Sequence, residues 1–339
     1  MIHTLTLLSL LAACDTSDPK DPGDDTDVSD DTDPSADDTD VADDTDVADD
    51  TDLPPDPATV PLRGTCTDAT RWGRFSIDSS TDYGFATGQV SNGVVPVSVL
   101  TEVTTDGECT IWRRENPFCD PSCAPGYTCD LTGTCVLYPA SQDVGTVTIR
   151  GLAEPVSMTP LPPGFSYSDT ALPNPPWLDG LAITLSTGGG AFDPVTLHGV
   201  GPISLVPTTL DWLVVQGDDM VLTWDVPPGS PRTEVVARLR IDQHGRTPSN
   251  IECRFVDDGE GVISAPLIDE LAALGLTGFP AGDLIRRTAD SAPIGDGCVE
   301  LITSSSRRAN VEVEGYTPCR TDAMCPPPLE CNELLERCE

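Results

Sequence analysis

Residues 283–315 read DLIRRTADSAPIGDGCVELITSSSRRANVEVEG, and this stretch is rich in strand-forming side chains. The runs DLIRRTAD, CVELITSSS and ANVEVEG carry β-branched or alternating apolar residues, and SAPIGDG supplies a break of Pro and Gly. Working outward, similar runs follow Leu210, namely DWLVV, MVLTWDV, TEVVARLRIDQ and NIECRFVD. The pattern predicts a β domain over residues 207–315.

The same rhythm occurs earlier in the chain, in RWGRFSI, VVPVSVLTEV, CTIWRR, VGTVTIRGL, LAITLS and VTLHGVGPISLV. Breaks rich in Pro and Gly, such as LPPGF and LPNPPW, separate these runs and favour a β-sandwich over residues 61–206. The predicted fold class is therefore all-β, with two antiparallel β-sandwich domains. One helix is expected in SAPLIDELAALG, where Ser264 can cap, Pro266 suits the first turn and Gly275 can end it.

The segments LTWDVPPG and VARLRI resemble strands B and C of fibronectin type III or immunoglobulin-like domains. In those domains a Trp on an early strand anchors the core. The resemblance implies that Trp224 is buried in the second domain, whereas the helix in SAPLIDELAALG departs from that family's pattern and is expected to cap one end of the sandwich.

Two clusters of four cysteines stand out, in residues 117–138 and in residues 316–339. In both, five residues separate the second and third cysteines, and a Pro follows the second by two positions. Modules of about twenty residues cannot bury a core, so disulfides are favoured over zinc, whose sites use closer pairs. The modules resemble short cysteine-rich repeats of the Dickkopf type, a brace without activity. Their cysteines, with three connectivities open in each module, are Cys119, Cys123, Cys129 and Cys135, then Cys319, Cys325, Cys331 and Cys338.

Four other cysteines lie in the β regions: Cys66, Cys109, Cys253 and Cys298. The first two are 43 residues apart and the last two 45 residues apart. These near-equal separations suggest one long-range disulfide within each domain.

The remaining cysteine, Cys14, explains why the total of thirteen is odd. It follows a short apolar run, Leu5 to Ala13, which suits an export signal and is too short to span a bilayer. The residues LAAC resemble the lipobox of bacterial lipoproteins. The resemblance implies a signal peptide over 1–13 and acyl chains such as palmitate on Cys14, which would anchor the chain to a membrane outside the cytoplasm, at the outer membrane or cell surface.

Residues 14–60 contain repeats of DDTD, and residues 15–59 hold nineteen Asp and one Lys. Mutual repulsion and the lack of large apolar side chains predict a disordered tether that reaches on the order of 150 Å when extended. The spacing of its acids does not match an EF-hand loop, so we expect only weak, non-specific Ca²⁺ binding.

Charge argues against nucleic acid as a partner, because the formal net charge is −38 and no run of basic residues suggests a basic face. Catalytic motifs are also missing: the sequence contains neither a Gly-x-Ser-x-Gly elbow nor HExxH, and His198 and His244 are expected to be structural or solvated. We therefore expect no catalytic residue, no metal and no cofactor.

The layout resembles uncharacterised envelope lipoproteins, a family that supplies no chemistry. The predicted function is a structural or protein-binding role in adhesion or interaction, with an unknown envelope protein or polysaccharide as partner. One alternative is carbohydrate binding or substrate capture, for which the candidate stacking residues are Trp72, Trp112, Tyr167 and Trp177. A second alternative is an envelope hydrolase, which would need a cleft with two carboxylates, or His198 beside a serine.

Overall fold

The computed structural model describes residues 55–115, 117–228, 232–241 and 248–339. The signal peptide, Cys14, the acidic repeats and His244 lie outside these residues, so their predictions are not tested. All described residues belong to one compact unit. No helix among them is both long and apolar enough to cross a membrane.

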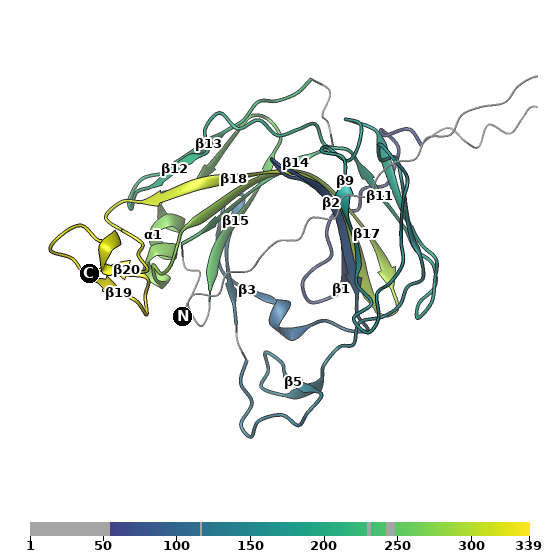
Figure 1. The fold of residues 1–339 in the computed structure, drawn as a ribbon, viewed down its shortest axis with the longest axis horizontal. Helices are drawn as coiled ribbons and strands as arrows, with labels where there is room; N and C mark the ends of the chain where they lie inside the picture. Colours follow the sequence, from purple (N-terminus) through teal and green to yellow (C-terminus); the bar gives the residue numbers. More distant parts are fainter. Residues whose placement is uncertain (1–54, 116, 229–231, 242–247) are drawn as a thin grey trace, which may run out of the picture. The chain divides into compact units, whose positions relative to one another are not determined.

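The chain is all-β, as predicted, and Figure 1 shows its largest sheet curving as an arch. Within the described residues this sheet has ten strands, in the order β3-β4-β15-β14-β17-β18-β1-β2-β9, with β12 also paired to β18. Their bounds are β1 Arg71–Ser79, β2 Gly84–Val90, β3 Leu100–Asp106, β4 Cys109–Arg114, β9 Tyr167–Leu172, β12 Asp211–Val214, β14 Glu234–Arg240, β15 Ser249–Val256, β17 Ala281–Ile294 and β18 Gly297–Val313.

Smaller sheets pack on or extend from this arch. One has the order β11-β10-β7-β8, and the others are the pairs β13-β16, β5-β6 and β19-β20. Their bounds are β5 Tyr127–Cys129, β6 Cys135–Leu137, β7 Val147–Arg150, β8 Val156–Met158, β10 Ala182–Thr187, β11 Thr196–Val200, β13 Met220–Thr223, β16 Glu260–Ile263, β19 Cys331–Asn332 and β20 Arg337–Cys338. Two short 3-10 helices, η1 Pro96–Ser98 and η2 Asp322–Met324, complete the connections.

The predicted helix is confirmed as α1 Ala265–Leu274, with Ser264 at the N-cap position and Gly275 at the C-cap. The Ser264 side chain makes no capping bond, because its hydroxyl donates instead to Asp106 Oδ2 at 2.6 Å. Leu267, Ile268 and Leu271 are buried and attach α1 to the neighbouring sheets.

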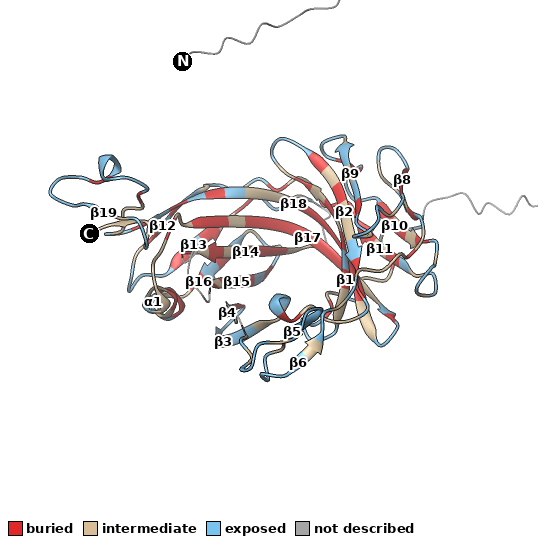
Figure 2. Cartoon of the chain, turned by 60° about the horizontal axis from the view of Figure 1, so that its bottom comes forward, coloured by how far each residue is buried: buried red, intermediate tan, exposed pale blue. Residues whose placement is uncertain are grey.

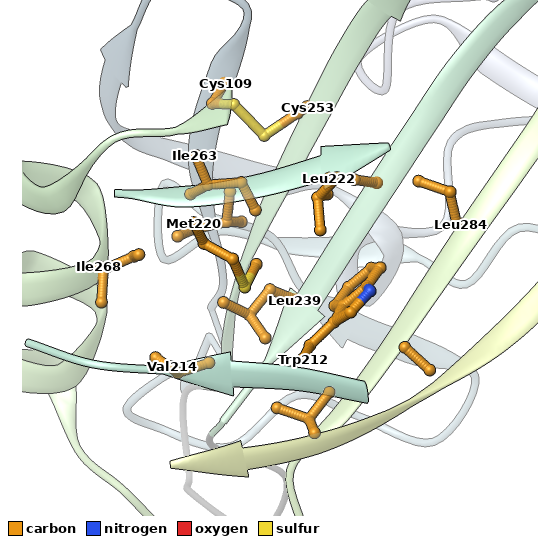
Figure 3. Packing of buried hydrophobic residues seen from close by; sticks show 14 of the residues in the cluster. Cys109, Trp212, Val214, Met220, Leu222, Leu239, Cys253, Ile263, Ile268 and Leu284 are labelled. Carbon is orange, nitrogen blue, oxygen red and sulfur yellow. A yellow bond between two sulfur atoms is a disulfide. The ribbon is translucent and has the colours of Figure 1, made fainter. Parts of the chain in front are cut away.

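Two hydrophobic cores confirm that the fold contains layered sandwiches. The first core lies between β4, β14 and β15 of the large sheet and the elements β12, β13, β16 and α1 that cover them (Figure 3). Trp224 belongs to it and stacks on Phe255 with ring centroids 6.0 Å apart, as the resemblance implied. The second core lies between β1 and β2 of the large sheet and the sheet β11-β10-β7-β8.

Both cores lie on the same face of the large sheet. On β18, Val299 and Leu301 belong to the second core, while Ala309 and Val311 belong to the first. These residues are all odd-numbered, and side chains two apart on an unbroken strand point to the same side. The red bands along β17 and β18 in Figure 2 mark the residues that are buried where the two cores meet the sheet.

The predicted domain boundary at residues 206 and 207 does not separate two sheets. Strands β1 and β4, from the first predicted domain, pair with β18 and β15, from the second. This occurs because β17 and β18 are 14 and 17 residues long, and each runs past both cores. Two of these pairings, β1 with β18 and β12 with β18, are parallel, whereas the sequence predicted antiparallel sandwiches.

All twelve cysteines in the described residues form disulfides. Each module joins its first cysteine to its third and its second to its fourth, so the two modules share one connectivity: Cys119–Cys129 with Cys123–Cys135, and Cys319–Cys331 with Cys325–Cys338.

The pairing suggested for the other four cysteines is wrong. The bridges are Cys66–Cys298 and Cys109–Cys253, and each joins the first predicted domain to the second. Cys109 and Cys253 are register partners on β4 and β15, so strand pairing brings them together. The prediction from equal spacing failed because it required each disulfide to form within one domain, whereas both disulfides link the two predicted domains.

Candidate functional site

A large cavity lies on the face of the large sheet that points away from both cores. We call this face the arginine face and the cavity, of about 1160 Å³, the arginine pocket. Strands β4, β14, β15 and β17 contribute to it, together with residues 65–74 and the turn at residues 98–100. Seven of the chain's seventeen arginines line the pocket: Arg71, Arg74, Arg114, Arg238, Arg240, Arg254 and Arg287.

Strand alternation puts these arginines on one face. On β14, Ala237 and Leu239 enter the first core, so Arg238 and Arg240 point to the opposite side. On β15, Ile251, Cys253 and Phe255 are buried in the core in the same way, and the side chains at positions 250, 252 and 254 line the pocket. The period-two alternation of apolar and charged residues in VARLRI and ECRF therefore indicates which side chains face the pocket. In the sequence, this alternation was interpreted only as evidence for strands.

This observation corrects the expectation that the chain lacks a basic face. The net charge of −38 belongs to the whole chain, and nineteen of its acids precede residue 60. The pocket lining, by contrast, holds seven arginines and two carboxylates, those of Asp68 and Glu252.

The N-terminal part of the folded unit forms one wall of the pocket. Residue 60, placed in the tether by the sequence analysis, is buried: Val60 packs against Ala182 and Val200, and Arg232 donates to its carbonyl at 2.6 Å. The chain then crosses the edge of β17, where Gly64 N donates to the Ala289 carbonyl at 3.2 Å.

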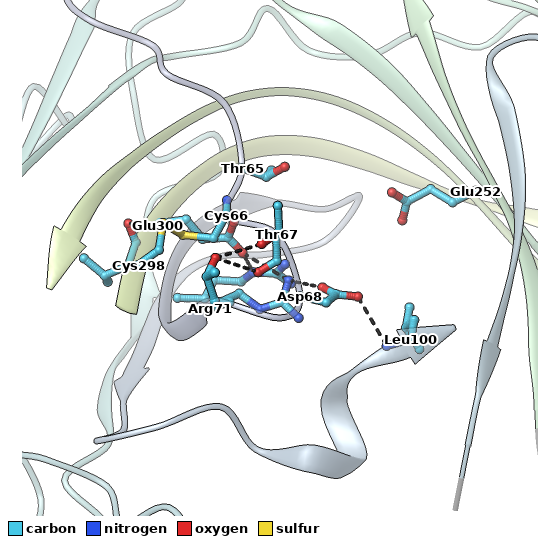
Figure 4. Close-up of polar contacts among 12 residues, drawn as sticks. Thr65, Cys66, Thr67, Asp68, Arg71, Leu100, Glu252, Cys298 and Glu300 are labelled. Atoms are coloured by element: carbon cyan, nitrogen blue, oxygen red, sulfur yellow. Dashed lines mark hydrogen bonds and ion pairs between the residues drawn. A yellow bond between two sulfur atoms is a disulfide. The ribbon is translucent and has the colours of Figure 1, made fainter. Parts of the chain in front are cut away.

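On the far side of β17 the chain reaches the arginine face and is held there by the Cys66–Cys298 disulfide (Figure 4). Cys66 N donates to Glu300 Oε2 at 2.8 Å. The guanidinium of Arg74 reaches Glu300 Oε1 at 2.6 Å, and that of Arg71 pairs with Asp68 at 2.7 Å. This wall is therefore tied to β18 by a covalent bond and by a carboxylate, that of Glu300, which is fully buried.

Glu252 lies among several arginines in the pocket. Its carboxylate accepts from Arg238 Nε at 2.9 Å and from Arg254 Nη2 at 3.1 Å. Burial raises the pKa of Glu252, but the charges of Arg238 and Arg287 and the hydrogen bond from Arg238 outweigh it, so the pKa lies below its ordinary value. Glu252 is therefore ionised at neutral pH and occupies guanidinium donors that an external anion would otherwise contact.

Arg287 is the most deeply buried arginine of the pocket, with 4% of its side chain exposed. Its Nε donates to Glu234 Oε1 at 2.8 Å, while its Nη2 is buried without a hydrogen-bond partner. Burial lowers the pKa of Arg287, an effect that the nearby Glu234 and Glu252 charges oppose. An unpaired N–H in such a place costs free energy, about 1–3 kcal/mol or more for a charged group, unless an acceptor reaches it.

At the outer end of β4, Arg114 is exposed and forms no ion pair within the described residues. The other six arginines share five carboxylates, since Glu252 and Glu300 each serve two. Because each guanidinium carries five N–H donors, these arginines have more donors than the five carboxylates can accept.

Of the four aromatic residues that were candidates for stacking on a sugar, three belong to or pack against the second core and one lines the pocket. Tyr167 and Trp177 are buried in the second core, so neither ring is available to stack on a sugar. The Tyr167 hydroxyl accepts a hydrogen bond from Val144 N at 3.0 Å. Trp72 packs against that core with Phe192, their ring centroids 6.0 Å apart. Trp112 differs, because it is half-buried and lines the arginine pocket.

Within the described residues, one of the two expected hydrolase arrangements has its residues in place, because the pocket is lined by two carboxylates, those of Asp68 and Glu252. The other arrangement, His198 beside a serine, is not formed among these residues. The ring of His198 lies 3.5 Å from Asp290, and its backbone N–H donates to the same carboxylate; it shows no contact with a serine hydroxyl. In the pocket, the lowered pKa of Glu252 opposes a role as general acid, which requires a raised one. The arrangement is suited to holding an anion.

Comparisons with known proteins add little. No family model matches the chain, and no curated protein matches it. Among solved structures, the FN1–FN3 domains of chicken CNTN1 are similar at 6% identity over 66% of this chain and 68% of that one, with a TM-score of 0.18. A Ca²⁺-stabilised adhesin with which an Antarctic bacterium binds ice is similar at 11% identity, over 74% and 75%, with a TM-score of 0.17. At such scores neither likeness carries an argument about this protein.

Proposed function

We propose that this chain is an exported, lipid-anchored protein of the cell envelope that captures an anionic ligand in its arginine pocket and catalyses no reaction. The observation that carries the proposal is the lining of the pocket, which holds seven arginines and only two carboxylates, those of Asp68 and Glu252. Arg287 also has a buried Nη2 without a hydrogen-bond partner, and a ligand oxygen would satisfy that donor if the side chain turns toward the pocket on binding.

The proposed location rests on chemistry outside the pocket. Six disulfides in the described residues favour an oxidising compartment, because cytoplasmic reductants keep such thiols reduced. The residues LAAC supply the lipid attachment point at Cys14. An adhesion or interaction role follows if the captured anion belongs to another molecule of the envelope.

Capture of anions is tested with the full-length protein in detergent. Isothermal titration calorimetry with polyacrylate as the probe should detect binding that the double variant Arg114→Gln/Arg254→Gln weakens at least tenfold. Both side chains are substantially exposed, so the fold should persist.

The matched control is Arg150→Gln, an exposed arginine on β7 in the other sheet. This variant should bind polyacrylate as the wild type does. Equal weakening by both variants, or no binding by the wild type, would contradict the proposal.

The anchor is tested separately by Cys14→Ser. The variant should leave the membrane fraction and enter the soluble exported fraction, with its disulfides formed. Unchanged partition into detergent would show that lipid on Cys14 is not what holds the protein.

A further inference from the structure

We infer that the ligand of the arginine pocket is an acidic polysaccharide, a chain of sugar rings that carry carboxylate or sulfate groups. This inference rests on the proposed function and names the ligand class. It depends on what the pocket offers besides charge.

An aromatic ring and an amide lie in the same wall as the arginines. Trp112 on β4 and Asn250 on β15 are register partners, and both line the pocket. Sugar rings present a face of C–H groups that packs on an indole, while their hydroxyls bond to amides and other polar side chains. Trp112 therefore provides an aromatic surface on which a sugar ring can stack, and a ligand bound by charge alone would not need such a surface.

The rest of the lining is suited to hydroxyl groups. Apart from its nine charged residues, the pocket carries six polar side chains that can donate and accept: Thr65, Thr67, Ser98, Thr110, Ser249 and Asn250. A polyhydroxy anion can use both sets of partners, with its acidic groups on the arginines and its hydroxyls on these side chains.

The size of the pocket favours a polymer. Small-molecule pockets commonly measure about 300–1,000 Å³, and this one measures about 1160 Å³. Several linked sugar units would fill it, and their regularly spaced charges would meet arginines from four strands, β4, β14, β15 and β17, and from the wall at residues 71–74.

An acidic peptide fits the pocket less well. Strands β4, β14 and β15 are each paired on both sides, so they offer no free edge to which a peptide could add as a strand.

A single-stranded nucleic acid also fits less well. Nonspecific binders of single strands stack successive bases on a series of aromatic rings. Trp112 is the only aromatic residue that lines the pocket among the described residues.

The test compares short polyanions of equal length on full-length protein in detergent, by calorimetry: oligogalacturonate, an oligoaspartate peptide and oligothymidylate, with neutral malto-oligosaccharide as the blank. A chelator is present, because the nineteen Asp of residues 15–59 could otherwise bridge to acidic sugars through Ca²⁺. A sulfated oligosaccharide distinguishes sulfate from carboxylate as the preferred acidic group.

We expect oligogalacturonate or the sulfated sugar to bind at least tenfold more tightly than the peptide and the oligonucleotide. Trp112→Ala should remove that preference, and Trp112→Phe, which keeps an aromatic face, should retain most of it. Thermal unfolding of each variant shows whether the fold is intact.

Equal affinity for all polyanions, unchanged by Trp112→Ala, would overturn the inference about sugars and leave anion capture standing. Preference for the peptide or the oligonucleotide would overturn it in the same way. Absence of binding to every polyanion would overturn the proposed function itself.

Discussion

Arg286 and Arg287 are neighbours on β17 and point to opposite faces of the large sheet, so they allow the two faces to be compared. Arg286, 1% exposed on the face of the cores, donates to both oxygens of Asp257, at 2.7 and 3.0 Å, and to backbone carbonyls, among them that of Asp225. Arg287 is nearly as buried on the arginine face but leaves its Nη2 without a partner.

The difference shows how one sheet combines stability with binding. Where the two cores meet, several buried hydroxyl groups are hydrogen-bonded: those of Thr288 and Thr303 to each other at 2.6 Å, and that of Ser305 accepts from Leu205 N at 3.0 Å. On the opposite face, donors exceed acceptors. The first face fixes the two sandwiches beside each other, and the second keeps donors available for a ligand.

The largest effect on stability is expected from Asp257→Asn. It leaves the buried Arg286 charge uncompensated and weakens the bonds from Trp224 Nε1 and Thr233, which should lower the free energy of unfolding by about 3–5 kcal/mol. Denaturant unfolding measures this. Anion affinity of the folded variant should be unchanged, and a loss of affinity with intact stability would reverse the roles given to the two faces.

Removal of the Cys66–Cys298 bridge comes next. The double variant Cys66→Ser/Cys298→Ser should lose about 2–5 kcal/mol of stability, because this disulfide closes a loop of 232 residues. It should also weaken anion binding, since the bridge holds one wall of the pocket. Cys123→Ser/Cys135→Ser, in the first module, is the control and should leave the main unfolding transition in place.

Arg287→Gln should act on binding and hardly on stability. A hydrogen bond to a charged group contributes about 1.5–3 kcal/mol, so the affinity for a polyanion should fall by about ten- to a hundredfold. The free energy of unfolding should change by no more than about 1 kcal/mol, because the partner Glu234 is 36% exposed and can be hydrated. A stability loss as large as that of Asp257→Asn would mean that Arg287 is structural.

The smallest effect concerns pH and Glu252. Its pKa is lower in the folded protein than its ordinary value of 4.5, so ionised Glu252 stabilises the fold above that pH. This contribution is lost as pH falls below 4.5 through the folded pKa. Glu252→Gln should flatten that part of the stability curve and, at neutral pH, raise anion affinity by freeing Arg238 and Arg254. A lower affinity in this variant would show that Glu252 positions the arginines instead of competing for them.

The sequence predicted the all-β class, α1 and the burial of Trp224, because strand rhythm and helix boundary residues are local signals. Long-range pairing has no such signal, which is why the bridges at Cys66 and Cys109 were assigned the wrong partners.

The candidate site was missed for a related reason. The alternating arginines of β14 were interpreted only as strand rhythm. Arg74, Arg114 and Arg287 join them through long-range strand pairing, namely β1 with β18, β4 with β15 and β17 with β14. Whole-chain charge obscured the basic cluster as well, since a net charge of −38 does not show where arginines gather locally.

The central claim, that the two faces of one sheet are divided between structure and ligand capture, is tested most directly by the NMR signals of the arginine side chains. In protein labelled at arginine, the Nε–H resonances of Arg286 and Arg287 are identified by their loss in the Arg286→Lys and Arg287→Lys variants and followed as oligogalacturonate is added. The account predicts that the Arg287 signal shifts as the ligand binds and that the Arg286 signal stays in place. A stationary Arg287 signal in the presence of bound ligand, or equal shifts of both signals, would contradict it.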